Sequence, residues 1–205
     1  MKKSMSKNRD LHGNVPDHRP VVLMLVDVLN SLEFPGAEAL VKMAPALARN
    51  IAALKQRCRK AGIPAVYVND NWKKWRSDVT SVIQHCMRDD APGRALVEPL
   101  LPSRADYIVL KPKHSAFYAT PLDTLLSYLR TRAVVLVGLT TDACVLTTAC
   151  EIHTRDLKLI VPSDCVAASD KRSHRIAIEL MEKSFEAQTT PSGKLNLRRL
   201  IVNPS

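Results

Sequence analysis

The run VVLMLVDVLN, residues 21–30, decides the fold class, because its first part is apolar without the alternation of a half-exposed strand. Uninterrupted apolar runs are typical of parallel strands that are covered on both faces. Similar runs predict strands at residues 63–68, 106–111, 133–138 and 157–162, with a short last strand at 187–190. Amphipathic helical segments separate them. This alternation predicts a three-layer α/β/α, Rossmann-like domain with a mostly parallel sheet of about six strands.

The alternation of strands and helices occupies residues 20–192, which we assign to a single domain. Residues 1–19 are expected to form a flexible basic arm, and residues 193–205 a basic tail. The stretch of residues 69–102 interrupts the alternation and is predicted to contain one helix, at about residues 77–87. Connections of this length inside a compact domain are usually functional.

A net charge of +10 is compatible with nucleic-acid binding, so its distribution along the chain matters. Residues 1–20 hold five Lys or Arg against two Asp, and residues 194–205 hold three basic residues and no acid. A surface that binds single-stranded nucleic acid combines basic residues with aromatic residues on which the bases stack, and no basic run of this sequence contains such aromatic residues. A solvated surface excess is therefore favoured over a nucleic-acid partner. A basic binding protein without catalytic activity stays as an alternative.

Cysteine usage and hydropathy bear on the compartment. The five cysteines are odd in number and form no CxxC pair, which argues against a disulfide framework and against a zinc site. No run of about 18 apolar residues is present, and the basic first residues lack the apolar stretch of a signal peptide. We expect a cytoplasmic protein that needs no membrane, no metal and no cofactor.

Three reactive residues come at the ends of predicted strands. Asp27 follows the first strand, Lys111 ends the third, and Cys144 opens the helix after the fourth. Each alone has an ordinary explanation, since an Asp caps turns, a Lys reaches solvent and a Cys fills a core. Parallel sheets, however, bind ligands beyond the carboxyl ends of their strands. If the three strands are neighbours, the three side chains meet at one edge of the sheet.

The position of Cys144 predicts an unusual thiol. The stretch GLTTDACV, residues 138–145, places it at a helix start, where backbone N–H groups and the helix dipole favour the thiolate. We expect the thiolate to be favoured modestly, with Lys111 outweighing the opposing Asp27, so that Cys144 is the most reactive cysteine. The other four cysteines are expected to be buried core thiols: Cys58, Cys86, Cys150 and Cys165. Two histidines, His114 and His153, are expected to be surface or helix residues.

The segments LMLVDVLN, KPKHSAFYAT and GLTTDACV, in this order, resemble the three signature segments of the isochorismatase-like cysteine hydrolases. The resemblance extends from about residue 21 to residue 192. It implies that Cys144 is the nucleophile, that Asp27 is the general base and acid, and that Lys111 is the cation beside both. It also implies a cis peptide at Leu139–Thr140, which would direct the N–H groups of Thr140 and Cys144 at a developing oxyanion.

Departures from the family pattern narrow the expected activity. Nicotinamidases of this superfamily bind a metal through an Asp-x-His pair after the second strand, but here no histidine occurs in that region before His85. Isochorismatases proper lack the cysteine, so Cys144 argues against vinyl-ether hydrolysis, which stays as the alternative activity. The resemblance thus implies a metal-independent hydrolase that cleaves a small amide or carbamoyl C–N bond through a thioester.

Several residues near the strand ends are candidates for the substrate pocket, with ordinary packing as the competing explanation. They are Asn30, Phe34, Trp72, Phe117 and Tyr118, and Trp75 lies close to them in the chain. The small molecule itself is not specified by the sequence. A homo-oligomer, dimer or tetramer, is also expected, because the family often assembles and residues 69–102 are long enough to reach a neighbour's pocket.

Overall fold

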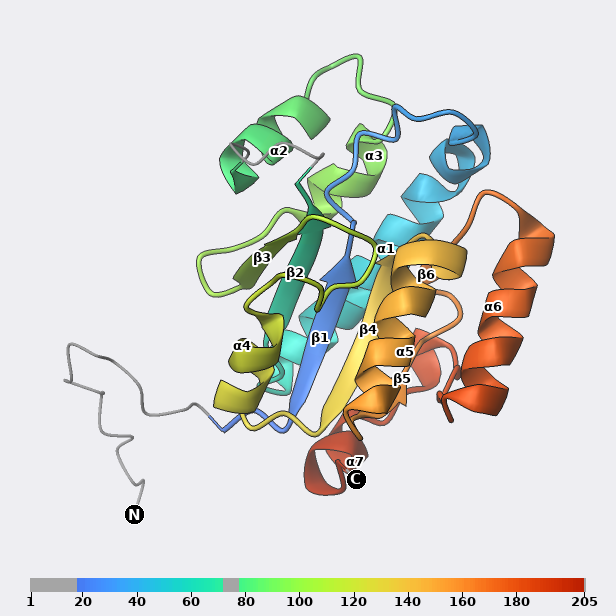
Figure 1. Ribbon diagram of the computed structural model, residues 1–205. Coiled ribbons are helices and arrows are strands. Elements are labelled where there is room, and N and C mark those ends of the chain that lie inside the picture. Colours follow the sequence, from blue (N-terminus) through green and yellow to red (C-terminus); the bar gives the residue numbers. More distant parts are fainter. Residues whose placement is uncertain (1–17, 72–77, 205) are drawn as a thin grey trace.

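The sheet runs through the centre of the molecule in the computed structural model, which describes residues 18–71 and 78–204 (Figure 1). The strands follow the order β3-β2-β1-β4-β5, and β6 also pairs with β4. Every strand pairing is parallel. The strands are β1 (Val21–Val26), β2 (Ala65–Asp70), β3 (Tyr107–Lys111), β4 (Ala133–Leu139), β5 (Lys158–Ile160) and β6 (Val166–Ala167).

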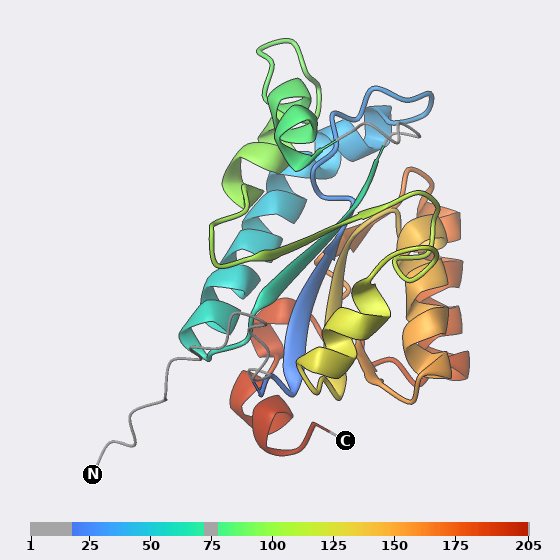
Figure 2. The same cartoon turned by 60° about the vertical axis from the view of Figure 1, so that its left-hand side comes forward.

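Helices cover both faces of this sheet, which gives the three layers that the sequence predicts (Figure 2). The longest, α1 (Glu38–Lys60), lies on one face, and α4 (Leu122–Tyr128), α5 (Leu146–Thr154) and α6 (Lys171–Ser184) lie on the other. The remaining helices are α2 (Val79–Cys86), α3 (Arg94–Val97) and α7 (Leu197–Val202). The helix expected near residues 77–87 is therefore confirmed as α2, and the side chain of Asp78 caps it by accepting the N–H of Ser81. Among the described residues, no helix is both long and apolar enough to span a bilayer.

The burial of β1 explains why its sequence does not alternate. Side chains of Val21, Leu23 and Leu25 pack in the cluster on the α1 face. Their neighbours Val22 and Met24 pack in the opposite cluster, beneath α4 and α5. All are at most 1% exposed, and burying a side chain of this size contributes about 1.5–3 kcal/mol.

Strands β1 and β4 approach each other closely at their carboxyl ends. Gly138 of β4 has a φ of +123°, and a Cβ at this position would lie 2.0 Å from the carbonyl oxygen of Val26. Only glycine leaves room for this contact and adopts this backbone conformation at little cost. The close approach brings the turn after β4 beside the residue that follows β1.

The last strand differs from the sequence prediction. Residues 187–190 contribute a single bridge, between Gln188 and Ile160, and no strand. The sixth strand is instead β6, whose two residues extend the edge beside β4. A strand of two residues carries no apolar periodicity, so the sequence has no signal for it.

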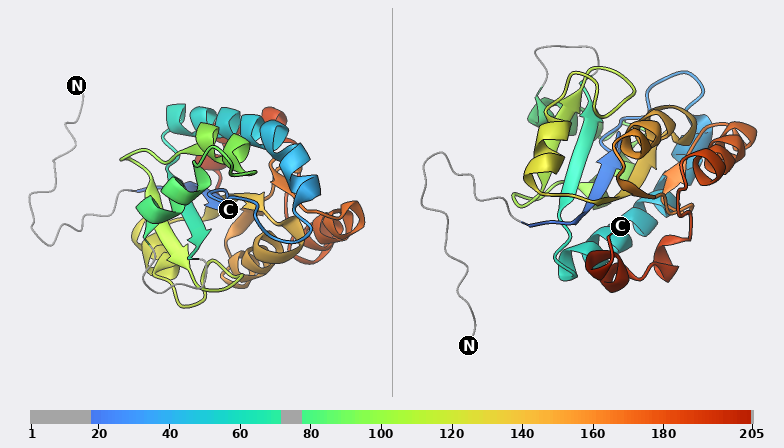
Figure 3. Two further views of the ribbon diagram at one scale, coloured as in Figure 1. Left: turned by 90° about the horizontal axis from the view of Figure 1, so that it is seen from above. Right: turned by 60° about the horizontal axis from the view of Figure 1, so that its bottom comes forward.

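Most of the basic C-terminal tail, residues 193–205, is folded onto the α1 face. Leu195, Leu197 and Leu200 are at most 7% exposed and belong to the core cluster of that face. The guanidinium of Arg57 donates to the carbonyls of Ser192 and Leu195 at 2.6 and 2.7 Å. Figure 3 shows α7 beneath the sheet, next to the start of the strands. The three leucines explain the docking, since their spacing gives this short segment an apolar side despite its positive charge.

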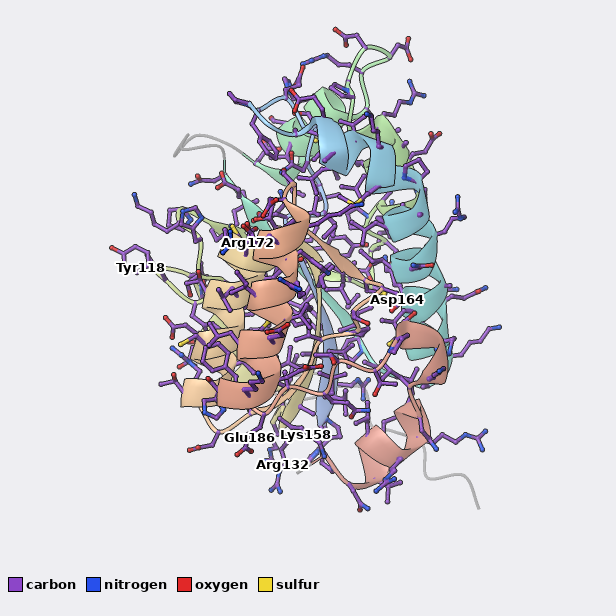
Figure 4. All side chains as sticks on the ribbon, turned by 90° about the vertical axis from the view of Figure 1, so that its right-hand side faces the viewer. Tyr118, Arg132, Lys158, Asp164, Arg172 and Glu186 are labelled. Carbon is purple, nitrogen blue, oxygen red and sulfur yellow. The ribbon has the colours of Figure 1, made fainter. Side chains whose placement is uncertain are left out.

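The loop around Asp164 also holds this segment in place. The Asp164 carboxylate accepts the backbone N–H and the hydroxyl of Ser192 at 2.6 and 2.7 Å. Its backbone carbonyl accepts the side-chain amide of Asn50 in α1 at 2.9 Å. Figure 4 shows Asp164 between α1 and the C-terminal residues.

Candidate active site

Asp27, Lys111 and Cys144 meet at the carboxyl edge of the sheet, the edge that faces the viewer on the left of Figure 3. The Nζ atom of Lys111 lies 2.7 Å from Asp27 Oδ2 and 3.4 Å from Cys144 Sγ. Strands β1 and β4 are neighbours, whereas β2 separates β3 from β1. The expectation of three neighbouring strands is therefore met for two of them. The long Lys111 side chain reaches past β2 to join them.

Asp27 is held by the turn that ends β1. Its φ of +51° is left-handed, a conformation that aspartate adopts more readily than most residues. Its Oδ1 accepts the N–H of Asp70 at 2.6 Å. Burial raises the pKa of Asp27, although Lys111 and hydrogen bonds from Lys111, Cys144 and Asp70 oppose the rise. A carboxylate with a raised pKa is a stronger proton acceptor than an exposed one.

Lys111 is a fully buried cation. Its side chain is 0% exposed, and its Nζ also donates to the carbonyl of Lys113 at 3.1 Å. Burial lowers the pKa of Lys111, but the charge of Asp27, its hydrogen bond and the smaller contributions of Cys144 and Asp70 together raise it, so the ammonium form is kept. Buried charges of this kind persist only when they are paired and hydrogen-bonded.

Cys144 lies in a π-helical turn, Thr141–Val145, directly before α5, and is half-buried. Burial and the charge of Asp27 raise the pKa of the Cys144 thiol to about 12, and Lys111 opposes them only in part. The expectation of a favoured thiolate is therefore wrong for this site. The physical reason is desolvation, because burial destabilises the thiolate of Cys144 more than Lys111 and the helix start stabilise it.

The turn that carries Cys144 has the predicted cis peptide at Leu139–Thr140. A side-chain contact from α6, which the sequence did not suggest, also stabilises this turn. His174 Nδ1 lies 2.9 Å from the hydroxyl of Thr141, whose side chain is fully buried. Burial lowers the pKa of His174, and Asp142 opposes this shift. The pair Thr141 and His174 is 33 residues apart and belongs to no short motif, so only the fold reveals it.

A cavity of about 510 Å³ opens over these residues, within the range of small-molecule sites. Asn30 and Phe34 line it, as expected, together with Leu139 and Thr140. The other lining residues include several polar side chains that the sequence analysis did not assign to the pocket: Ser31, Glu33, Asp70, His85 and His114.

Two predicted pocket residues do not line the cavity. Phe117 is buried in the core on the α5 face, with the guanidinium of Arg155 4.1 Å from its ring centroid. Tyr118 is 59% exposed and points away from the molecule (Figure 4). Their loop is anchored to α5, which turns Phe117 into the core and its neighbour to solvent. Trp72, and with it Trp75, lies outside the described residues.

His114 is the most informative of the cavity residues to which the sequence analysis gave no role in the site. We expected it on the surface, and it is exposed, but its Nδ1 lies 3.4 Å from Cys144 Sγ. Further out, Glu33 Oε2 lies 2.5 Å from His85 Nε2. The signal for His114 was its place three residues after Lys111 in KPKHSAFYAT, within the segment that forms the site.

The remaining cysteines divide in two. Cys58, Cys86 and Cys165 are buried, as expected. Cys150 is exposed, contrary to expectation, because it falls on the solvent side of α5. It does not line the cavity.

Among residues 18–71 and 78–204, no three His, Cys, Asp or Glu side chains are gathered as ligands for a metal ion.

Fold and site together define a class: a parallel α/β domain with a cysteine beside a buried carboxylate–ammonium pair at its carboxyl edge. The chain belongs to the isochorismatase family, because the Isochorismatase domain matches its residues 21–192. This confirms the resemblance that the three segments indicate. Members of the family are hydrolases that act on amides and related bonds.

Similar proteins span most of the chain. YaaI, an isochorismatase family protein of Bacillus subtilis, is 33% identical over 168 residues, which are 82% of this chain and 92% of YaaI. The ureidoacrylate amidohydrolase RutB of Methylobacterium radiotolerans is 27% identical, over 82% of this chain and 76% of RutB. The crystal structure of N-carbamoylsarcosine amidase from Thermoplasma acidophilum has 27% identity and a TM-score of 0.67, and covers 86% of this chain and 98% of its own.

Proposed function

We propose that the protein is a metal-independent cysteine hydrolase that cleaves a small amide or carbamoyl C–N bond through a thioester on Cys144. The observation that carries this proposal is the position of the buried Lys111 Nζ, 2.7 Å from Asp27 Oδ2 and 3.4 Å from the Cys144 sulfur, next to the cavity that Asp27 and Cys144 line. A cysteine, a carboxylate and a cation in contact supply a nucleophile, its base and the charge that keeps the base ionised.

Acylation begins with a neutral thiol, which agrees with the raised pKa of Cys144. Asp27 takes the thiol proton as the sulfur attacks the carbonyl carbon of the substrate. The carbonyl electrons move to oxygen, and the N–H groups of Thr140 and Cys144 stabilise this oxyanion. When the carbonyl re-forms, the C–N bond breaks, the nitrogen takes the proton from Asp27, and the amine leaves. The product is a thioester, which water then hydrolyses.

The charges in the site are suited to these reaction steps. A proton moves readily between two groups when their pKa values are close. Burial raises the pKa of Asp27, which makes this carboxylate a better acceptor for the thiol proton than an exposed one. Lys111 remains an ammonium throughout, and stabilises whichever partner is the anion.

The relatives support the same bond type. N-carbamoylsarcosine amidase and ureidoacrylate amidohydrolase are both named for the hydrolysis of C–N bonds. Both are 27% identical to this chain over more than four fifths of its length. We therefore propose amide and N-carbamoyl compounds as the first substrates to test.

The test is release of ammonia from a panel of small primary amides and N-carbamoyl amino acids. Cys144→Ala should abolish release and Asp27→Asn should nearly abolish it, whereas Cys150→Ala, an exposed cysteine outside the cavity, should retain full activity. The vinyl-ether alternative predicts the reverse pattern on isochorismate, because that reaction needs no thioester. Retention of isochorismate hydrolysis in Cys144→Ala, with no ammonia release by the wild type, would overturn the proposal.

A further inference from the structure

We propose that His114 is a further catalytic residue: it takes the proton of the water that hydrolyses the thioester and passes it to the Cys144 sulfur as the sulfur leaves. This inference rests on the proposed function and assigns the second half of that reaction to a group of its own. Its basis is the contact between His114 Nδ1 and Cys144 Sγ, at 3.4 Å.

The sulfur of Cys144 has two different sides. Asp27 and Lys111, 5% and 0% exposed, approach it from the interior. His114 is exposed and lines the cavity, so it approaches the same sulfur from the side where water enters. The attacking water arrives from the cavity, which makes His114 the group better placed to meet it.

The loop after β3 holds His114 in this position from both sides. The carbonyl of the preceding Lys113 accepts a hydrogen bond from Lys111 Nζ at 3.1 Å. Two residues further on, the N–H of Ala116 donates to the hydroxyl of Thr148 in α5, also at 3.1 Å. His114 is thus fixed between the buried cation and the helix that follows Cys144. A loop residue anchored in this way is positioned for chemistry, although its ring is open to solvent.

Asp27 is less open to incoming water, although it also lines the cavity. It is only 5% exposed, and its Oδ1 and Oδ2 face the N–H of Asp70 and the ammonium of Lys111, whereas His114 is exposed. An imidazole, in contrast, has one ring nitrogen that can accept a proton and can later donate it. His114 can therefore act as base and as acid within one turnover.

The proposed step balances as follows. The His114 imidazole takes one proton from water while the water oxygen bonds to the thioester carbon, and the carbonyl electrons move to oxygen. The carbonyl then re-forms, the C–S bond breaks with its electrons on sulfur, and the sulfur takes the proton from the imidazolium. Thioester and water become a carboxylic or carbamic acid and the free thiol, and His114 is neutral again.

The test uses 4-nitrophenyl acetate as an acylating probe, with quenched samples analysed by mass spectrometry for acetyl groups on Cys144. His114→Gln should still be acetylated, but its steady-state turnover should fall about 100-fold, the lower range for loss of a general base. Acetyl-enzyme should therefore accumulate, and hydroxylamine, which attacks a thioester without a base, should restore release. His153→Gln, an exposed histidine on α5 outside the cavity, is the matched control and should behave as the wild type.

The outcomes separate the two proposals. Unchanged turnover in His114→Gln would overturn the role of His114 and leave the thioester mechanism standing. Slow turnover of His114→Gln with unacetylated Cys144, when the wild type is acetylated there in samples quenched within its first turnover, would also overturn it, because His114 would then act before the thioester forms. If neither protein is acetylated on Cys144 even in such early samples, the proposed function fails, and the inference fails with it.

Discussion

Replacing Lys111 by methionine tests the buried pair directly. Methionine fills a similar volume without the ammonium, so the change removes the charge that faces Asp27 at 2.7 Å and little packing. Asp27, 5% exposed, then either stays ionised without a partner or takes up a proton. Breaking a buried ion pair by removing one member costs about 3–5 kcal/mol. Turnover should be lost as well, because Lys111 also contacts the sulfur.

The cost should depend on pH, with a sign that follows from Asp27. Burial raises the folded-state pKa of Asp27, and the loss of Lys111 raises it further. A group with a raised folded pKa favours folding below its unfolded pKa, about 3.9 for Asp, and loses that contribution as the pH rises through the folded pKa. Lys111→Met should therefore be destabilised less at about pH 5 than at about pH 8.

Urea unfolding at the two pH values is the assay. A loss of about 3 kcal/mol lowers the midpoint by about 1 M if the urea dependence is about 3 kcal/mol/M. Lys183→Met, an exposed lysine on α6, is the control and should change the free energy of unfolding by less than about 0.5 kcal/mol. The double variant Asp27→Asn/Lys111→Met removes both charges and should be more stable than Lys111→Met by about 2 kcal/mol.

Two results would refute the reasoning. One is an unfolding free energy for Lys111→Met within about 1 kcal/mol of the wild type at pH 8, which is the size of an ordinary surface change. The other is a double variant whose loss equals the sum of the two single losses, because additive losses mean that the two groups do not interact.

The remaining predictions concern the cysteines and the C-terminal residues. Limiting iodoacetamide near neutral pH should label the exposed Cys150 before Cys144, because the pKa of the Cys144 thiol is raised to about 12. Peptide mass spectrometry measures the order of labelling. Faster labelling of Cys144 would show that the free site already holds a thiolate. Leu200→Ala should lower the free energy of unfolding by about 2–5 kcal/mol, because Leu200 is 6% exposed in the α1-face core, and Val202→Ala, at a side chain 76% exposed, should not. If the two variants are equally stable in urea, the leucines of residues 195–200 are not packed in the core.

The fold was predictable where burial leaves a pattern in the sequence. The unbroken apolar run of β1 reflects helices on both faces, and the parallel sheet follows from the helical segments between the strands. The sequence could not indicate β6, because two residues have no periodicity. Nor did it show that residues 195–200 are docked, since their basic side chains obscured the three leucines.

The candidate site was predictable for residues fixed by regular structure. Asp27, Lys111 and Cys144 follow strands whose ends the topology gathers at one edge. Phe117 lies in an irregular loop, where sequence spacing does not determine the direction of a side chain. The sign of the Cys144 pKa shift was beyond the sequence for another reason, because it depends on how deeply the sulfur is buried. The oligomeric state and the compartment stay predictions.

The route by which Lys111 reaches Asp27 has a consequence for folding kinetics. The two residues are joined only when β2 lies in register between β1 and β3, since Lys111 pairs with Asp70 at the end of β2. A slip of one residue in this pairing would turn Lys111 to the opposite face of the sheet. Contacts between distant segments in parallel sheets form late and slowly. The ion pair therefore forms only when the sheet is complete and in register, and regained activity during refolding will report the completed sheet rather than the first collapse.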